Sequence, residues 1–239
     1  MRESFNRIED GQSLHVEVDI NAFAYTKKYS WLLSVFIKFD AMDSTAEGYE
    51  EFLDTKEALI IALEHQEIAK YVGMRVVDGW SEFYFYASHS KGLDKQVAKI
   101  LNSSEYIYES SVVKDTKWSF YQHNLYPSEL DFCHLQSEKI IALLEEEGDD
   151  LSVVREVEHY VSFQTPTQKE RFINSLHVKG FSYKDDISSD EFEHGVALVK
   201  EHSVTSEEVQ EIVDELFQSI KKEGGYYEGW STVLAKEVE

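Results

Sequence analysis

The side chains in this sequence that are best suited to chemistry are its nine histidines. A metal site on a helix needs histidine or carboxylate side chains three or four residues apart, because only then do they share one face. His65 has no such partner. His159 alternates with Val157 and Val161, so its imidazole is expected to point inward, where a neighbouring strand would bring it near His194. A buried histidine satisfied by a hydrogen bond is the simpler interpretation.

Signatures of covalent catalysis and of phosphate binding are missing from the sequence. No Gly-x-Ser-x-Gly elbow occurs, and Cys133 lies in a predicted helix between Phe132 and His134, as a core or half-buried thiol would. Gly224 and Gly225 follow a helix and precede no Lys-Ser/Thr pair. The 46 carboxylates are too numerous to single out an acid–base pair. We therefore expect a non-catalytic protein with no cofactor and no metal.

Aromatic residues are concentrated near the end of the sequence. Tyr226 and Tyr227 follow a glycine pair that ends a helix, and Trp230 comes shortly after. Tyr and Trp are favoured in binding hot spots because they bury a large area at low entropic cost. The alternative is that Trp230 closes the core of its domain.

The elements of the second half have to position these residues. Apolar residues alternate along 153–163, the period of a strand, and Thr205 and Glu208 are placed for a capping box at the start of a helix. The predicted elements are a helix at 128–147, a strand at 153–163, a helix at 167–178, strands at 181–187 and 192–202 around a turn at 188–190, a helix at 206–222 and a strand at 226–234.

The first half has a similar order of elements. Asp78-Gly79 separates two strand-like runs, which predicts a tight hairpin. Strands are predicted at 14–20, 31–39, 74–77, 80–87, 106–113 and 118–125, and helices at 47–71 and 93–101. From Trp31 onward, and again in the second half, the order is β-α-β-β-α-β, the split arrangement of ferredoxin-like folds. We therefore predict an α+β protein with two consecutive ferredoxin-like domains and antiparallel sheets.

The join between the two domains is predicted near an acidic run at 145–150. Acidic side chains at the C-terminal end of a helix oppose its dipole, so these residues do not stabilise the helix before them. The simplest interpretation of the run is a solvated linker. We expect one domain at 1–128 and the other at 129–239.

Charge is distributed unevenly between the halves. The net charge is −23; residues up to Glu129 carry 13 basic and 21 acidic groups (−8), and the rest carry 10 and 25 (−15). Such a field repels nucleic acids and anionic membranes and favours a basic protein segment as partner. The alternative is that the acidity only maintains solubility.

Features of targeting and membrane insertion are also missing. No run reaches the ~18 consecutive apolar residues of a membrane helix, and the N-terminal residues contain no apolar signal region. The single cysteine fits a reducing compartment. We expect a cytoplasmic protein.

The second half resembles the regulator of ribonuclease E activity B (RraB) family. Arg155–Phe163 (REVEHYVSF) is close to that family's R-x-V-x-H-x-x-x-F first strand, and Gly180-Phe181 follows the first helix as in the family. Tyr227–Trp230 (Tyr-Glu-Gly-Trp) differs from the usual Tyr-Asp-Gly-Trp only by Glu for Asp. The resemblance implies an acidic ferredoxin-like domain that binds an endoribonuclease and inhibits RNA turnover without cutting RNA itself.

The first half is similar to the domain-of-unknown-function 695 family. The similarity rests on the strand from Trp31, on Gly79–Tyr86 (GWSEFYFY) and on Asp115–Tyr121 (DTKWSFY), which leads to Leu125-Tyr126-Pro127. It implies no activity, since none is assigned to that family.

Together these observations predict a non-catalytic regulatory protein that binds a basic protein segment, and the resemblance to the RraB family implies an RNA-processing enzyme as the partner. The candidate partner-binding residues are Arg155, His159, Tyr227, Glu228 and Trp230. Two alternatives remain open: a small-molecule- or metal-binding enzyme that uses the sheet face around His159 and His194, and an oligomeric scaffold held together by aromatic edge strands.

Overall fold

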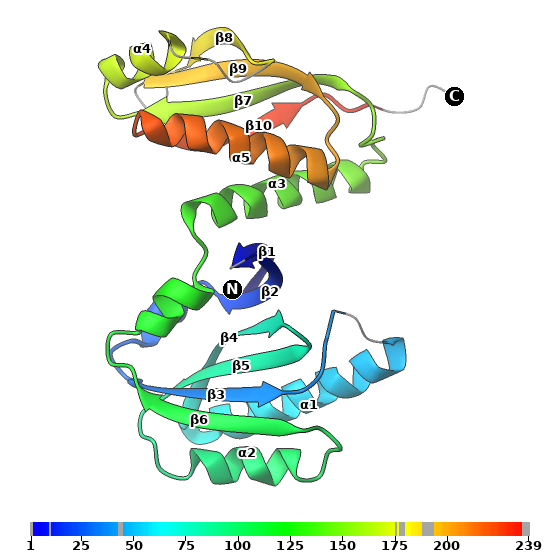
Figure 1. Ribbon diagram of the computed structural model, residues 1–239, viewed down its shortest axis with the longest axis vertical. Helices are drawn as coiled ribbons and strands as arrows, with labels where there is room; N and C mark the ends of the chain where they lie inside the picture. Colours follow the sequence, from blue (N-terminus) through cyan, green and yellow to red (C-terminus); the bar gives the residue numbers. More distant parts are fainter. Residues whose placement is uncertain are drawn as a thin grey trace. The chain divides into compact units, whose positions relative to one another are not determined.

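A computed structural model of the chain describes residues 2–9, 11–42, 45–174, 176, 180–187 and 194–235. The chain forms two compact units, Met1–Tyr126 and Pro127–Glu239, whose elements are labelled in Figure 1. Each unit contains one antiparallel sheet together with helices, so the predicted α+β class is confirmed. None of the helices within the described ranges has the length and apolar character needed to cross a membrane.

The first unit is built around a six-stranded sheet. Its elements are β1 (Arg2–Glu9), β2 (Gln12–Asp19), η1 (Ala22–Tyr25), β3 (Trp31–Ile37), α1 (Ala46–Glu64), η2 (His65–Glu67), β4 (Ala69–Val77), β5 (Trp80–Ala87), α2 (Leu93–Leu101), β6 (Tyr108–Lys114) and η3 (Tyr121–Leu125). The strand order is β1-β2-β4-β5-β3-β6, with antiparallel neighbours. In the β-α-β-β-α-β segment the first strand, β3, lies between the third and the fourth, in agreement with the ferredoxin-like arrangement.

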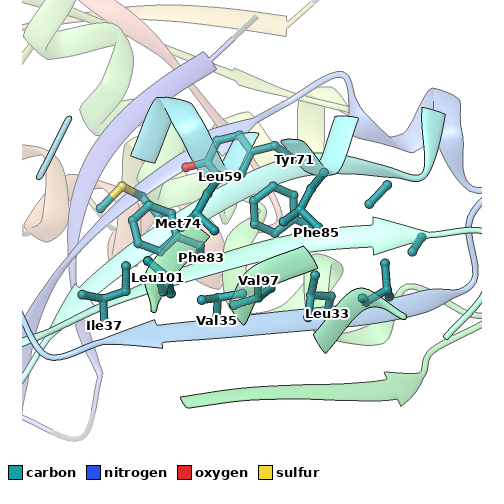
Figure 2. Packing of buried hydrophobic residues seen from close by; sticks show 14 of the residues in the cluster. Leu33, Val35, Ile37, Leu59, Tyr71, Met74, Phe83, Phe85, Val97 and Leu101 are labelled. Atoms are coloured by element: carbon teal, nitrogen blue, oxygen red, sulfur yellow. The ribbon is translucent and has the colours of Figure 1, made fainter. Parts of the chain in front are cut away.

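The core of the first unit lies between this sheet and the helices α1 and α2. Leu33 and Val35 of β3 are fully buried and pair in register with Phe85 and Phe83 of β5. These residues lie on one face because strand side chains alternate. Figure 2 shows them packed together with Val97 of α2.

The predicted helix at 47–71 is wrong at its C-terminal end. Helix α1 ends at Glu64, and Gln66 and Glu67 then adopt positive φ angles of 53° and 57°. Tyr71 lies instead in β4, opposite Phe85 of β5. The apolar residues near 68–72 fit either a helix or a strand, and pairing with β5 decides between them.

The predicted strand at 118–125 is wrong, and strand β1 was not predicted. The carboxylate of Asp115 accepts the backbone N–H groups of Ser119 and Phe120 at 2.9 and 3.0 Å, which starts a helical turn. The chain continues into the π-helix η3. Strand β1 lies at the sheet edge with most of its residues at least partly exposed, so its sequence lacks a clear apolar alternation.

The second unit has a four-stranded sheet in the order β10-β7-β9-β8, again with antiparallel neighbours. Its elements are α3 (Glu129–Glu146), β7 (Arg155–Phe163), α4 (Pro166–Asn174), β8 (Ser182–Ile187), β9 (His194–His202), α5 (Ser206–Lys222) and β10 (Tyr226–Thr232). Strand β7 lies between β9 and β10, the same order as in the first unit. Figure 1 shows α5 lying along this sheet, and α3 packs against α5 and β10.

Several details of the second half differ from the predictions. The strand at 153–163 begins only at Arg155, because Val153 and Val154 are exposed. The capping box of Thr205 and Glu208 does not form: the hydroxyl of Ser203 donates to Glu208 instead. The predicted turn at 188–190, the start of the strand predicted at 192–202 and most of the last turn of the helix predicted at 167–178 fall outside the described residues.

Candidate functional site

Arg155 begins β7, and its guanidinium lies inside the second unit. Its Nη1 and Nη2 atoms donate to the two carboxylate oxygens of Asp149 at 2.9 and 2.6 Å, and these side chains are 7% and 0% exposed. The same carboxylate accepts the backbone N–H of Ala235 at 2.8 Å. This bidentate pair therefore joins three segments. The prediction that the acidic run at 145–150 is a solvated linker is wrong for Asp149.

His159 lies at the centre of β7 and is fully buried. Its Nδ1 atom is 2.8 Å from the hydroxyl of Tyr227, and its Nε2 atom is 3.0 Å from Nε2 of His202. The other ring nitrogen of His202, Nδ1, is 2.5 Å from the backbone carbonyl oxygen of Ser203. We call these four groups the histidine chain.

The proton positions along the histidine chain follow from its carbonyl end. A carbonyl oxygen only accepts, so Nδ1 of His202 carries a proton and Nε2 of the neutral ring accepts. Nε2 of His159 therefore donates to His202, which leaves Nδ1 of His159 to accept from the Tyr227 hydroxyl. Every group in the histidine chain therefore has a hydrogen-bond partner while both rings are neutral.

The environment keeps these groups neutral around pH 7. Burial, together with the neighbouring imidazole of His202 and the positive charge of Lys200, lowers the pKa of His159 to about 3. Burial also lowers the pKa of His202, against the opposing effect of its hydrogen bond to Ser203. Burial raises the pKa of the Tyr227 hydroxyl well above its ordinary value. A general base needs a pKa near the working pH, and these groups do not provide one.

The expected neighbour of His159 was His194, and this is wrong. The register of β7 and β9 places His194 opposite Phe163, while His159 contacts His202 nearer the other end of β9. No group of three or more His, Cys, Asp or Glu residues among those described is arranged to hold a metal ion.

Trp230 lies in the core, as the alternative interpretation of this residue expected. It is 4% exposed, and its indole Nε1 donates to the hydroxyl of Ser137 on α3 at 3.0 Å. It packs with Val157, Val209 and other residues between α3, α5 and the sheet. Its role in the structure is to hold α3 against the sheet, and its ring offers little surface to another protein.

Tyr227 and Glu228 lie at a bulge in β10. The pairing of β10 with β7 shifts by one residue between Tyr227 and Gly229, so Glu228 has no partner in the register. The Glu228 side chain is exposed, and its carboxylate accepts the hydroxyl hydrogen of Ser162 on β7. Bulges of this kind redirect a side chain at a sheet edge.

A surface hollow of about 410 Å³ lies beside this bulge, between α3, α5 and β10. We call it the β10 hollow. Its walls include Phe132, Cys133 and Gln136 from α3, Phe217 and Lys221 from α5, and the tyrosines and Glu228 of β10. Residues 132 and 133 lie four and three positions before residue 136, so both are its neighbours on the helix surface. Burial in this wall raises the pKa of Cys133 to about 11.

The ammonium group of Lys221 lies inside the β10 hollow. Its Nζ atom is 4.6 Å from the ring centre of Tyr226 and 5.2 Å from that of Phe217. It is also 2.5 Å from a carboxylate oxygen of Glu129. Aromatic faces and a carboxylate together form a favourable site for a cation.

The sheet of the second unit has a second surface with functional potential. On the face opposite the His159 side chain, β7 presents Glu156 and Glu158, β8 presents Asp185, and β9 presents Glu201. Lys184 at the β8 bulge contacts Glu156 and Glu158 at 3.0 and 2.7 Å. We call this surface the open face. It presents four carboxylates, and two of them pair with Lys184.

The candidate partner-binding residues therefore occupy different environments. Arg155, His159 and Trp230 are buried, Tyr227 is half-buried, and Glu228 is exposed. The contact between Tyr226 and Lys221 was not predicted from the sequence, nor was the contact between His159 and His202. The alternation of Glu156, Glu158 and Tyr160 with buried residues was visible in the sequence and was the available signal for the open face.

The comparisons with known proteins divide the chain in the same way as its two units. Residues 5–126, just over half of the chain, match the family described as Family of unknown function (DUF695). Residues 134–232 match the family described as Regulator of ribonuclease activity B (RraB). No curated protein matches the chain.

Among solved structures, the crystal structure of an unknown protein from Galdieria sulphuraria is similar to this chain. The identity is 12%, the match covers 86% of this chain and 99% of that chain, and the TM-score is 0.24. The two family matches confirm the resemblances seen in the sequence. The chain belongs to the DUF695 family of unknown function, and its second unit carries a match to the family Regulator of ribonuclease activity B.

Proposed function

We propose that this chain is a non-catalytic regulatory protein that binds a basic segment of another protein, and that the partner is an RNA-processing enzyme. The observation that carries the proposal is the charge of the open face, which presents four carboxylates, of which Glu156 and Glu158 pair with Lys184. The match of residues 134–232 to a family of ribonuclease regulators supports the class of partner.

The open face suits a Lys- and Arg-rich segment for two reasons. Its carboxylates already hold one ammonium group, that of Lys184, at hydrogen-bond distance. Tyr160 lies on the same face, with its hydroxyl 2.7 Å from the Ser231 hydroxyl. Partly exposed tyrosine beside carboxylates provides both stacking area and charge for a guanidinium group. Complementary charge also steers a basic partner toward this face.

The test is affinity purification with the full chain as bait, at about 50 mM and about 500 mM salt, because screening grows with ionic strength. We expect a basic RNA-processing enzyme that is retained at low salt and lost at high salt. The variant carrying Glu156→Gln, Glu158→Gln and Glu201→Gln should lose it.

The matched control carries Glu207→Gln, Glu211→Gln and Glu215→Gln. These three residues are exposed on α5, so the control changes the net charge by the same amount at another surface. It should retain the partner. Equal loss from both variants, or a partner indifferent to salt, would contradict binding at the open face.

A further inference from the structure

The β10 hollow contains a cation-binding arrangement that the chain itself occupies. The ammonium group of Lys221 lies over the rings of Tyr226 and Phe217 and pairs with Glu129. The hollow therefore already shows which chemistry it accommodates: a positive group between aromatic faces, with a carboxylate at its edge. The half-buried Phe132 extends the apolar wall of the hollow.

The carboxylate of Glu228 also lines this hollow, and it can accept further hydrogen bonds. Glu228 receives one hydrogen bond, from the Ser162 hydroxyl, and within the described residues no Lys or Arg side chain forms an ion pair with it. A carboxylate has about four acceptor positions and is well matched to the paired N–H groups of a guanidinium. Two carboxylates thus line the hollow against the one ammonium group of Lys221.

We propose that the β10 hollow binds an arginine side chain of the basic partner, so this inference rests on the proposed function and deepens it. The guanidinium stacks on Tyr226 and forms a salt bridge with Glu228, and its methylene groups lie along Phe132. Lys221 moves outward toward solvent when the arginine enters. Arginine fits better than lysine because its planar group both stacks and donates two parallel hydrogen bonds.

An anionic ligand that pairs with Lys221 is the competing occupant. The structure favours the cation because Lys221 is already paired with Glu129 at 2.5 Å and Glu228 lies in the same hollow. An anion entering there would meet both carboxylates at short range, which is unfavourable.

The experiment measures binding of fluorescein-labelled hexa-arginine and hexa-lysine peptides to the full chain by fluorescence polarisation. The two peptides carry the same charge, so their difference reports the guanidinium. We expect hexa-arginine to bind more tightly, and Glu228→Gln to weaken it by about three- to tenfold, the range for one charged hydrogen-bonding contact at a partly exposed site.

A charge-matched pair of variants tests the role of Lys221. Lys221→Met and Lys222→Met each remove one positive charge, but Lys222 is exposed and does not line the hollow. We expect Lys221→Met to strengthen hexa-arginine binding more than Lys222→Met, because it removes the internal competitor.

The outcomes separate this inference from the proposed function. If the open-face triple variant weakens both peptides while Glu228→Gln binds like the wild type and Lys221→Met binds like Lys222→Met, the arginine site is overturned and the proposed function stands. If neither surface affects binding, both fail. If a phosphate-containing probe binds and Lys221→Met abolishes that binding, the hollow is an anion site and this inference is wrong.

Discussion

The Nε2 atom of His159 lies 3.0 Å from the Nε2 atom of His202, and one proton is shared between them in the folded protein. Both rings have pKa values lowered by burial, so the unfolded chain binds protons more readily than the folded chain below the ordinary value of 6.5. The contribution of these two rings to the free energy of unfolding should therefore be complete above pH 6.5 and should decrease as the pH falls toward 3. His159 alone accounts for a loss of about 2 kcal/mol at pH 5, at about 1.4 kcal/mol per pH unit.

Urea unfolding, followed through NMR signals of the second unit at pH 7 and pH 5, measures this dependence. His159→Gln should be less stable at pH 7 and should show a shallower loss between the two pH values. His194→Gln, on the same strand as His202 but outside the histidine chain, should keep the wild-type slope. The groups facing His159 and His202 are Tyr227, Lys200, Glu208 and Arg155. A wild-type slope in His159→Gln would assign the effect to other groups.

Removing the hydroxyl of Tyr227 should destabilise the second unit. Tyr227→Phe leaves Nδ1 of His159 buried without a donor, which costs about 1–3 kcal/mol. Tyr226→Phe is the control, because Tyr226 is 41% exposed and water can replace the hydroxyl that accepts from Nε2 of Gln164. Nitrogen chemical shifts of the imidazole rings provide a second readout: the wild type should show a protonated Nε2 in His159 and a protonated Nδ1 in His202.

Breaking the pair of Arg155 and Asp149 should be among the more damaging single changes in the second unit. Asp149→Asn leaves the guanidinium buried without its counter-charge, at a cost of about 3–5 kcal/mol. Lys184→Met breaks two ion pairs on the open face, where Lys184 is 40% exposed, and should destabilise the unit far less because water screens exposed pairs. If both variants lowered the free energy of unfolding in urea equally, burial of Arg155 would not increase the cost of breaking its ion pair.

Truncation of Trp230 should lower the stability of the second unit, and any loss of binding should follow from that destabilisation. Trp230→Ala opens a cavity between α3 and the sheet and should cost about 3–5 kcal/mol. Trp230→Phe keeps most of the packing but loses the hydrogen bond to Ser137, and should cost less. Circular dichroism with urea measures both. If Trp230→Ala folds with wild-type stability yet loses the partner, the indole contacts the partner directly.

Cys133 should react slowly with thiol reagents. Burial raises its pKa to about 11, so at pH 8 about one thiol in a thousand is ionised, and the thiolate is the reactive form. Alkylation by iodoacetamide should be much slower than that of glutathione at the same pH. Urea should restore the ordinary rate. Bound hexa-arginine should slow the reaction further if the peptide occupies the β10 hollow.

Much of the local structure could be predicted from the sequence. The helix at 93–101 and the helix at 206–222 have the predicted bounds, because their apolar residues recur at helical spacing. Gly92 lies just before the first helix, and Gly224 lies just after the second. The Asp78-Gly79 hairpin is confirmed, with positive φ at both residues, as such a turn requires. Predictions failed where a short apolar run fits two structures, as at 68–72, or where one carboxylate starts a turn, as Asp115 does.

The candidate site was predicted only in part for a related reason. Alternation along 155–163 correctly placed His159 among inward-pointing residues, since side-chain direction in a strand is a local property. Its neighbours were not predictable, because they depend on the register between strands. A shift along β9 would have placed His194 rather than His202 beside it.

The sequence by itself determined the α+β class, the order of elements in each half and the acidity of the second unit, because these depend on periodicity and composition. Tertiary structure decided which side chains meet. His159 and His202 are 43 residues apart, and the pairing of β7 with β9 brings them together. Trp230 and Ser137 are 93 residues apart, and the packing of α3 against the sheet makes them partners. The packing of these elements also buried Arg155 and Trp230 and left Glu228 exposed. Whether a side chain is buried depends on which elements pack around it, and the local sequence does not specify those elements.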